Sequence, residues 1–288
     1  MPGWQAVAKA AFSFDYDKWT TLLPRLAEKY ATNNPIPHIL LSGFLNDDTA
    51  SEITRTFLNV NIENWTQYKH HNEKKLGMAN RDLFPSRIRQ VIDELNSQVF
   101  LAWLSRLTRI PNLVADPSCE GGGLHQSGKG GFLNIHTDFS HHHYHKDWRR
   151  RVNLILYLNP AWQPEWGGSI ELWDITMRQC VVKYPPLFND VLIFNTDQRS
   201  LHGFPEPIQC PEGQSRKSLA LYYYSVESDS KFATCSTTYR PRPGEGVINS
   251  ALISLDNAAL DMYSRAKAHF GFSDQLASKI LGFISRKL

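Results

Sequence analysis

The stretch GFLNIHTD, residues 131–138, lies in the part of the chain whose strands decide the expected fold. Its apolar residues are typical of a short β-strand, and it ends in the pair His136 and Asp138. Side chains two residues apart on a strand point to the same face of the sheet, so both could reach one metal ion. The stretch therefore predicts a strand that carries two metal ligands at its end.

Further short runs of strand-forming residues surround this stretch. Together with residues 132–136 inside it, they comprise residues 151–159, 169–173, 180–184, 190–195 and 217–226. Turn-forming pairs at 159–160, 167–168 and 185–186 separate several of them. Many short strands with such punctuation indicate a mainly β core, either a sandwich or a jelly roll.

Helices are expected on both sides of this core in the sequence. Residues 84–110 space their apolar side chains at three and four residues, with Pro85 in the first turn, which predicts one amphipathic helix. Residues 38–45 predict a short strand, and residues 46–48 offer caps for a helix after it. Residues 252–288 have a helical composition.

The chain shows no internal repeat and no low-complexity linker. We therefore expect one domain over residues 1–288, with flanking helices packed around the β core. Its parts would be a helix-rich region at 1–120, a jelly-roll core at 121–230 and C-terminal helices at 245–288.

The bulk composition fits a folded globular protein of 288 residues, with 42% hydrophobic residues and a formal net charge of +3. No apolar run approaches the length of a membrane span, and the first 20 residues contain no signal-like apolar core, so we expect a soluble, cytoplasmic protein. The four cysteines form no CxxC pair, which favours free thiols. Nucleic-acid binding is not suggested, and the oligomeric state stays open.

A third metal ligand is available from a distant part of the chain. His202 follows the predicted strand at 190–195 and could join His136 and Asp138. Two imidazoles and one carboxylate leave three positions open on an octahedral metal. That arrangement suits a non-haem Fe(II) that binds a cosubstrate and O₂ together.

Arg216 lies 14 residues after His202 and opens a predicted strand. If Arg216 faces the interior of the core, alternation also directs Ser218, Ala220 and Tyr222 inward and Lys217 outward. A planar guanidinium beside a hydroxyl could hold a carboxylate. The row therefore predicts a carboxylate-binding site in the same core.

The order of several motifs resembles the Fe(II)/2-oxoglutarate oxygenase superfamily, nearest its prolyl-4-hydroxylase-like branch. The resemblance covers residues 121–226 and rests on His136-x-Asp138, Tyr157-Leu158-Asn159, the stretch WGGSIEL at 166–172, His202 and Arg216-x-Ser218. It implies a double-stranded β-helix, which is a jelly roll. It also implies Fe(II), 2-oxoglutarate as cosubstrate and O₂, with ascorbate as a candidate reductant.

The resemblance assigns roles to individual residues. His136, Asp138 and His202 would bind the iron, and Arg216 with Ser218 would bind the distal 2-oxoglutarate carboxylate. The remaining residues are Tyr157 as a donor to that carboxylate, Asn153, Ile155 and Ile170 as its pocket, and Arg150 and Tyr222 bordering the substrate. Alternation independently places Asn153, Ile155 and Tyr157 on one strand face.

The implied reaction is hydroxylation of an unactivated C–H bond, coupled to oxidative decarboxylation of 2-oxoglutarate to succinate and CO₂. Related halogenases have a small residue in place of the carboxylate ligand, so Asp138 favours hydroxylation, with desaturation or ring formation as variants. The substrate is a prolyl or other peptidyl residue in one reading. It is a small molecule, such as a free amino acid, a sugar or a natural product, in another. A catalytically silent jelly-roll binding module is the third alternative.

Other histidines are less informative. His141, His142, His143 and His145 form a cluster whose side chains diverge, which favours a solvated or substrate-facing loop over a second metal site. His125, in a glycine-rich stretch, is either a loop residue or a group that supports the site.

Overall fold

The computed structural model describes residues 12–57, 62–227 and 235–270, except for the side chains of residues 62 and 263–270. Its strands are β1 (His38–Ser42), β2 (Thr66–His70), β3 (Glu73–Met78), β4 (Val114–Ala115), β5 (Gly123–Ser127), β6 (Phe132–Thr137), β7 (Trp148–Tyr157), β8 (Ile170–Trp173), β9 (Cys180–Tyr184), β10 (Asp190–Asn195), β11 (His202–Phe204), β12 (Arg216–Val226) and β13 (Thr238–Tyr239). Its helices are α1 (Tyr16–Thr32), α2 (Asp47–Phe57), α3 (Ser86–Leu95), α4 (Gln98–Thr108) and α5 (Val247–Phe270), with short 3-10 turns at Ile62–Asn64, Arg81–Leu83 and Pro164–Trp166.

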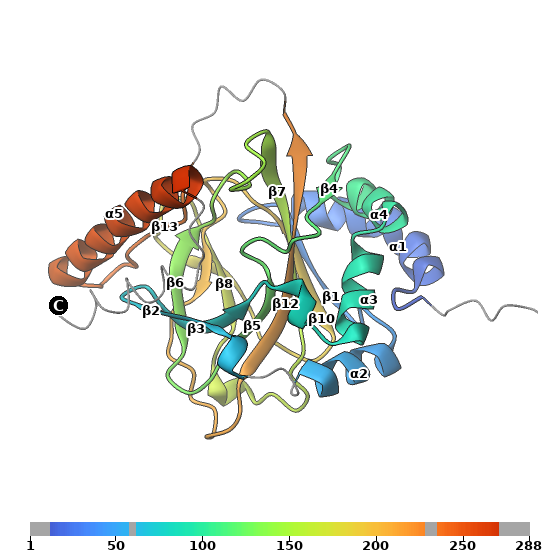
Figure 1. Ribbon diagram of the computed structural model, residues 1–288, viewed down its shortest axis with the longest axis horizontal. Coiled ribbons are helices and arrows are strands. Elements are labelled where there is room, and N and C mark those ends of the chain that lie inside the picture. Colours follow the sequence, from blue (N-terminus) through green and yellow to red (C-terminus); the bar gives the residue numbers. More distant parts are fainter. Residues whose placement is uncertain (1–11, 58–61, 228–234, 271–288) are drawn as a thin grey trace, which may run out of the picture.

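The strands form one antiparallel sheet that curls nearly into a barrel (Figure 1). Along the sheet the strands follow the order β1-β10-β7-β12-β5-β3-β6-β11-β8-β9. Most neighbours in this order are not consecutive in the sequence: β7 pairs with both β10 and β12, and β11 lies between β6 and β8. This arrangement confirms the prediction of a jelly-roll core with flanking helices.

Strand β10 shows how the sheet separates its two faces. Leu192 and Phe194 point into the barrel and pack in the cluster that contains Tyr157 and Leu172. Val191, on the other face, belongs to the larger cluster between the sheet and the helices. Because both faces are covered, the middle of β10, residues 191–194, is apolar on both faces rather than alternating.

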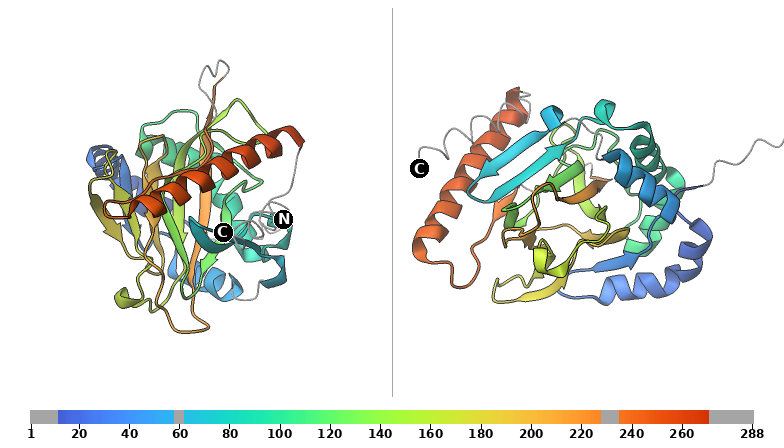
Figure 2. Two further views of the ribbon diagram at one scale, coloured as in Figure 1. Left: turned by 90° about the vertical axis from the view of Figure 1, so that its left-hand side faces the viewer. Right: turned by 90° about the horizontal axis from the view of Figure 1, so that it is seen from below.

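Helices α1 to α4 cover the outer face of the sheet on one side, and α5 lies on the opposite side next to β2 and β3 (Figure 2). Aromatic rings fill much of the interface beneath α1 and α4. Trp103 donates a hydrogen bond from Nε1 to the Trp19 carbonyl (3.2 Å), and Phe14 packs on both rings. The helices thus support the outer face of the sheet and leave the barrel interior free for the site.

The prediction of a single helix over residues 84–110 is wrong. The chain forms α3 and α4, with a break at Asn96 and Ser97. Ser97 has extended backbone angles, and its hydroxyl accepts a hydrogen bond from the amide of Phe100 (3.3 Å), so it caps a new helix. Apolar spacing alone continues across this break because both helices bury their apolar faces in the same core.

Several strands were not anticipated, among them β2, β3 and β5. The β2–β3 hairpin is rich in charged and polar residues, and β5 lies within the glycine-rich stretch that contains His125. A Cβ atom at Gly123 would lie 2.3 Å from the Met78 carbonyl oxygen, so glycine is required where β5 passes β3. The expected C-terminal helix is α5 over its described part, and residues 271–288 lie outside the described residues.

Candidate active site

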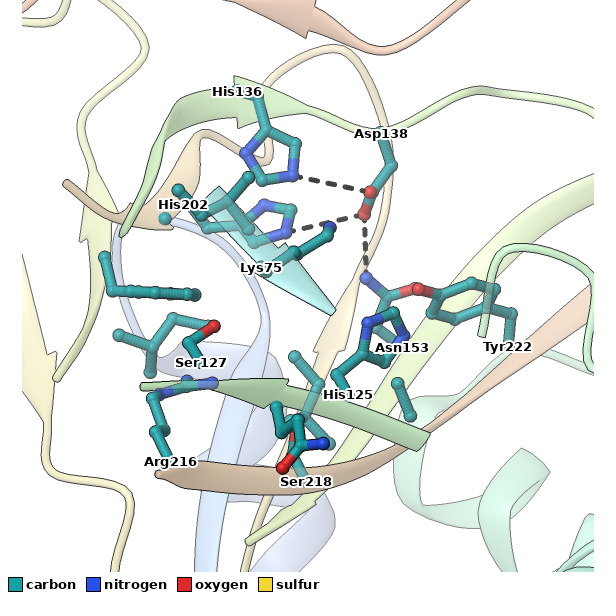
Figure 3. A pocket seen from close by; sticks show the side chains of 17 residues that line it. Lys75, His125, Ser127, His136, Asp138, Asn153, His202, Arg216, Ser218 and Tyr222 are labelled. Atoms are coloured by element: carbon teal, nitrogen blue, oxygen red, sulfur yellow. Dashed lines mark hydrogen bonds and ion pairs between the residues drawn. The ribbon is translucent and has the colours of Figure 1, made fainter. Parts of the chain in front are cut away.

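The sheet brings His136, Asp138 and His202 together. His136 lies near the end of β6, Asp138 follows that strand, and His202 opens β11 directly opposite His136. Nε2 of His136 lies 3.7 Å from Oδ1 of Asp138, and Nε2 of His202 lies 3.5 Å from Oδ2 (Figure 3). Within the described residues these are the three side chains whose donor atoms group closely enough to hold a metal ion, all within 4.8 Å of one another.

Both imidazole rings are oriented by backbone carbonyls. Nδ1 of His136 is 2.9 Å from the Asn134 carbonyl oxygen, and Nδ1 of His202 is 2.8 Å from that of Ser200. A carbonyl oxygen only accepts, so Nδ1 carries the hydrogen in each ring and Nε2 is left as the ligand atom. Burial lowers the pKa of His202 to about 4, against an opposing effect of Asp138, which keeps the ring in its neutral, metal-binding form.

Asp138 is held by two side chains from β7. Its Oδ2 accepts a hydrogen bond from Asn153 Nδ2 (2.8 Å) and lies 3.1 Å from Nη2 of Arg150. Burial disfavours the charged carboxylate, but the nearby Arg150 guanidinium outweighs it and holds the pKa of Asp138 well below its usual value. The site therefore presents a fixed, ionised carboxylate.

Arg150 and Tyr222, expected at the border of the substrate, lie against each other and beside Asp138. The Arg150 guanidinium carbon is 3.4 Å from the centroid of the Tyr222 ring, and Arg150 Nε donates to Asn153 Oδ1 (2.8 Å). Arg150 is only 2% exposed. Asn153, expected in the cosubstrate pocket, lines the cavity but directs its amide to Arg150 and Asp138. Arg150 and Asn153 thus orient the Asp138 carboxylate.

Arg216 lies at the other end of the same cavity (Figure 3). Its Nε donates to the Gly168 carbonyl (2.8 Å), its Nη2 donates to the Tyr157 hydroxyl (3.4 Å), and its guanidinium carbon is 4.3 Å from the Phe204 ring centroid. Among the described residues, no carboxylate pairs with this buried guanidinium, and the charged or polar side chain that acts on it is that of Tyr157. Such a group is suited to bind an anion that enters the cavity.

The predicted alternation along β12 describes the cavity wall. Arg216, Ser218, Ala220 and Tyr222 line the cavity, together with Ile155 and Ile170 from β7 and β8. Lys217 points elsewhere, since its Nζ donates to the Ser215 carbonyl (3.1 Å). Gly168 leaves room beside Arg216, because a Cβ there would lie 3.1 Å from Arg216 Cδ.

The donor set and the cavity fit a metal and a dicarboxylate cosubstrate. Two imidazoles that present their Nε2 atoms and one ionised carboxylate match the ligand set that leaves coordination positions free. Arg216 adds a buried cation without a carboxylate partner in the described chain, at the end of the cavity away from these ligands. A ligand bound at both ends would span the cavity.

Several cavity residues were not identified from the sequence. They are Gln126 and Ser127 from β5 and Lys75 from β3. His125, which the sequence left open as a loop residue or a group that supports the site, lies beside them on β5. Burial and the nearby Lys75 lower the pKa of His125 to about 3, so this ring is neutral. His125 thus lies on a strand of the cavity wall, because it is part of β5, and not in a loop.

The other histidine cluster does not assemble a second metal centre within the described residues. His142 lies 3.4 Å from Asp116, and His143 lies 2.9 Å from Glu120, so these rings have separate partners. His141 and His142 are buried rather than solvated, and His141 lines a second cavity beside Asp138, so the substrate-facing alternative stays a prediction. The loop packs its rings against Trp148 and Tyr224 instead.

Fold and site together define a jelly-roll protein in which His136, Asp138 and His202 could hold a metal ion. Residues 122–224 match the model of the family described as "2OG-Fe(II) oxygenase superfamily". The matched residues are nearly the same as those that carry the motif resemblance to the Fe(II)/2-oxoglutarate oxygenases.

One relative is similar over about two thirds of this chain. Prolyl 3-hydroxylase OGFOD1 of Xenopus laevis is 25% identical over 197 residues, which cover 66% of this chain and 35% of that protein. The match thus spans about a third of the length of this relative.

Among solved structures, a Trichoplax adhaerens prolyl hydroxylase in complex with a hypoxia-inducible-factor peptide fragment superposes with a TM-score of 0.55 at 20% identity, covering 75% of this chain and 94% of that one. A Pseudomonas putida prolyl-4-hydroxylase gives a TM-score of 0.52 at 16% identity, with 70% and 98% covered. These likenesses establish the double-stranded β-helix fold. No helix in the described ranges has the length and apolar character needed to cross a membrane.

Proposed function

We propose that the protein is an Fe(II)- and 2-oxoglutarate-dependent hydroxylase. One observation carries the proposal: His136, Asp138 and His202 line a single cavity together with the buried Arg216, which has no carboxylate partner among the described residues. A metal site alone would suit many functions, and an isolated cation would suit any anion. Their combination suits a cosubstrate that binds the metal at one end and presents a carboxylate at the other.

In this proposal His136, Asp138 and His202 hold the iron through Nε2 atoms and a carboxylate oxygen. Arg150 and Asn153 keep Asp138 ionised and oriented. The backbone carbonyls behind the imidazoles fix which nitrogen faces the metal. Each ligand is therefore set in place before any metal binds, which lowers the cost of assembling the site.

The cosubstrate carboxylate binds at Arg216, with the hydroxyls of Ser218 and Tyr157 as further partners. Tyr157 is fully buried and already contacts Arg216, so it holds the guanidinium in place. Ile155 and Ile170 exclude water between the two ends of the cavity. When bound, iron and 2-oxoglutarate supply the oxidation, in which O₂ converts the cosubstrate to succinate and CO₂ and places a hydroxyl group on a substrate carbon.

We further propose a prolyl or other peptidyl residue as the substrate. The names of the relatives support this class, and a second cavity offers space for it. That cavity, of about 360 Å³, adjoins the first at Asp138. It is lined by residues of the β6–β7 and β10–β11 connections, such as Phe139 and Gln198, and by Arg149 at the start of β7. Its volume lies within the range of about 300–1,000 Å³ usual for ligand pockets.

The experiment measures succinate in reactions that contain Fe(II), ascorbate, O₂ and 2-oxoglutarate with libraries of peptides or of free amino acids and sugars. Mass spectrometry then detects addition of one oxygen atom to a library member. Hydroxylation of a peptide supports the proposal, whereas hydroxylation only of a small molecule makes the protein a biosynthetic hydroxylase. Absence of any succinate formation would identify a catalytically silent module.

A further inference from the structure

A second cation shares the cavity with Arg216. Lys75 lies on β3, between β5 and β6, and its side chain lines the cavity. Its neighbour Lys74 is exposed, and its Nζ lies 3.5 Å from the Lys129 carbonyl outside the barrel. Alternation along β3 therefore selects Lys75 alone of this pair to point inward.

Lys75 is held by a chain of buried ionic contacts. Its Nζ lies 2.8 Å from Oε2 of Glu73, and Oε1 of Glu73 lies 2.8 Å from Nε2 of His70. Nδ1 of His70 lies 2.8 Å from Oδ2 of Asp256 on α5, which also accepts from Asn72 Nδ2 (2.6 Å). The chain thus connects α5 to the cavity through side chains that alternate in charge.

The charges of these four side chains, Lys75, Glu73, His70 and Asp256, balance one another before any ligand enters the cavity. Burial opposes protonation of His70, but Asp256 and Glu73 outweigh it and raise the pKa of His70 to about 9. The imidazolium and the Lys75 ammonium then balance Glu73 and Asp256. Since an ammonium has three donor hydrogens and Glu73 takes one, Lys75 keeps donors for a ligand in the cavity.

The two cations lie at different ends of the cavity. Arg216 lies at the end away from the metal-ligand side chains, whereas Lys75 points to the side of His202 and Asp138 (Figure 3). Asp138 is among the charges that act on Lys75. A dianion with carboxylates at both ends would place one at each cation.

We propose that Lys75 binds the carboxylate of 2-oxoglutarate on the metal side, and that Asp256, His70 and Glu73 act as positioning residues for it. The inference rests on the proposed function, because it concerns the same cosubstrate. It makes α5 a supporting element of the active site. Lys75 and Arg216 together then select an acid with two carboxylates.

The test compares Lys75→Met with the matched control Lys74→Met. Calorimetry under anaerobic conditions measures binding of two acids to the Mn(II)-loaded full chain. One is 2-oxoglutarate, and the other is 2-oxopentanoate, which keeps the keto group and the metal-side carboxylate but lacks the distal one. Arg216→Lys is measured alongside as the reference for the distal carboxylate.

Lys75→Met should weaken both acids by roughly ten- to a hundredfold, since one charge-assisted contact is lost. Arg216→Lys should weaken 2-oxoglutarate but not 2-oxopentanoate, and Lys74→Met should weaken neither. Wild-type affinity for 2-oxoglutarate in Lys75→Met would overturn the inference. Loss confined to 2-oxoglutarate would also overturn it, because Lys75 would then act on the distal carboxylate.

Failure of the proposed function gives a different result, namely that the wild-type protein binds neither acid. Asp256→Asn tests the positioning role, as it removes the charge but keeps the size of the side chain. It should weaken both acids several-fold with the same pattern as Lys75→Met. Unchanged affinity for both acids in Asp256→Asn would remove α5 from the site, and thermal unfolding of each variant verifies that it is folded.

Discussion

The Arg150 guanidinium lies 3.1 Å from the Asp138 carboxylate, and both groups are withdrawn from solvent. Arg150 therefore supplies the positive charge that keeps Asp138 ionised before a metal binds. Breaking a buried pair by removing one partner is costly because the other charge is left uncompensated.

Arg150→Met should lower the free energy of unfolding of the metal-free protein by about 3–5 kcal/mol at neutral pH. The Mn(II)-loaded protein should lose less, because the bound cation replaces the missing charge. Urea denaturation with and without Mn(II) measures both values. Arg149→Met, whose residue lies 3.5 Å from Glu227 instead, is the control. An equal loss in both metal states would mean that Arg150 supports packing rather than Asp138.

The His70 network predicts a pH dependence of stability. The folded-state pKa of His70 is raised to about 9 from 6.5, so its contribution is fully present below about pH 6.5 and is lost as the pH rises towards 9. The charged groups facing it are Glu73 from β3 and Asp256 from α5, with the Tyr239 ring alongside. The wild-type free energy of unfolding should fall by about 3 kcal/mol over this range. His70→Gln should remove most of this slope, and an unchanged slope would contradict the assignment.

Asp138→Ala should abolish hydroxylation, since the metal loses its only carboxylate ligand from the chain. Chloride transfer is not expected in its place, because the pocket around Asp138 is filled by Arg150 and Asn153. Product analysis by mass spectrometry in chloride buffer follows both outcomes. Normal hydroxylation by Asp138→Ala would show that the carboxylate is not a ligand.

Arg216→Lys should raise the 2-oxoglutarate requirement by about ten- to a hundredfold and leave metal binding nearly intact. An ammonium keeps the charge but cannot match both carboxylate oxygens as the planar guanidinium does. Lys217→Ala is the control, because Lys217 points away from the cavity to the Ser215 carbonyl. Titration of 2-oxoglutarate against both variants with Mn(II) bound measures the difference. If Lys217→Ala raises the 2-oxoglutarate requirement and Arg216→Lys does not, then Lys217 rather than Arg216 binds the distal carboxylate.

Local spacing predicted much of the site. Two-residue alternation is a property of any strand, so it placed His136 with Asp138 and Arg216 with Ser218 before the fold was known. Lys75 could not be found in this way. Its hairpin has no apolar alternation, and it reaches the cavity through pairing with β5 and β6, which are distant in the sequence.

The same limit applies to the helices and to the supporting contacts. Apolar periodicity located the helical region at 84–110 but not its break, which depends on the cap at Ser97. The roles of Arg150 and Asn153 depend on where β7 places them relative to Asp138. Such contacts follow from the register of the whole sheet rather than from any short motif.

The central claim is that one cavity holds both the iron and 2-oxoglutarate. Anaerobic titration of the Fe(II)-loaded protein with 2-oxoglutarate tests it most directly, because chelation of iron by a 2-oxo acid produces a visible absorption band without any primary substrate. The band should appear and saturate in the wild type, require more 2-oxoglutarate in Arg216→Lys, and be absent in His136→Ala and His202→Ala. A band of wild-type intensity and affinity in either histidine variant would contradict the account.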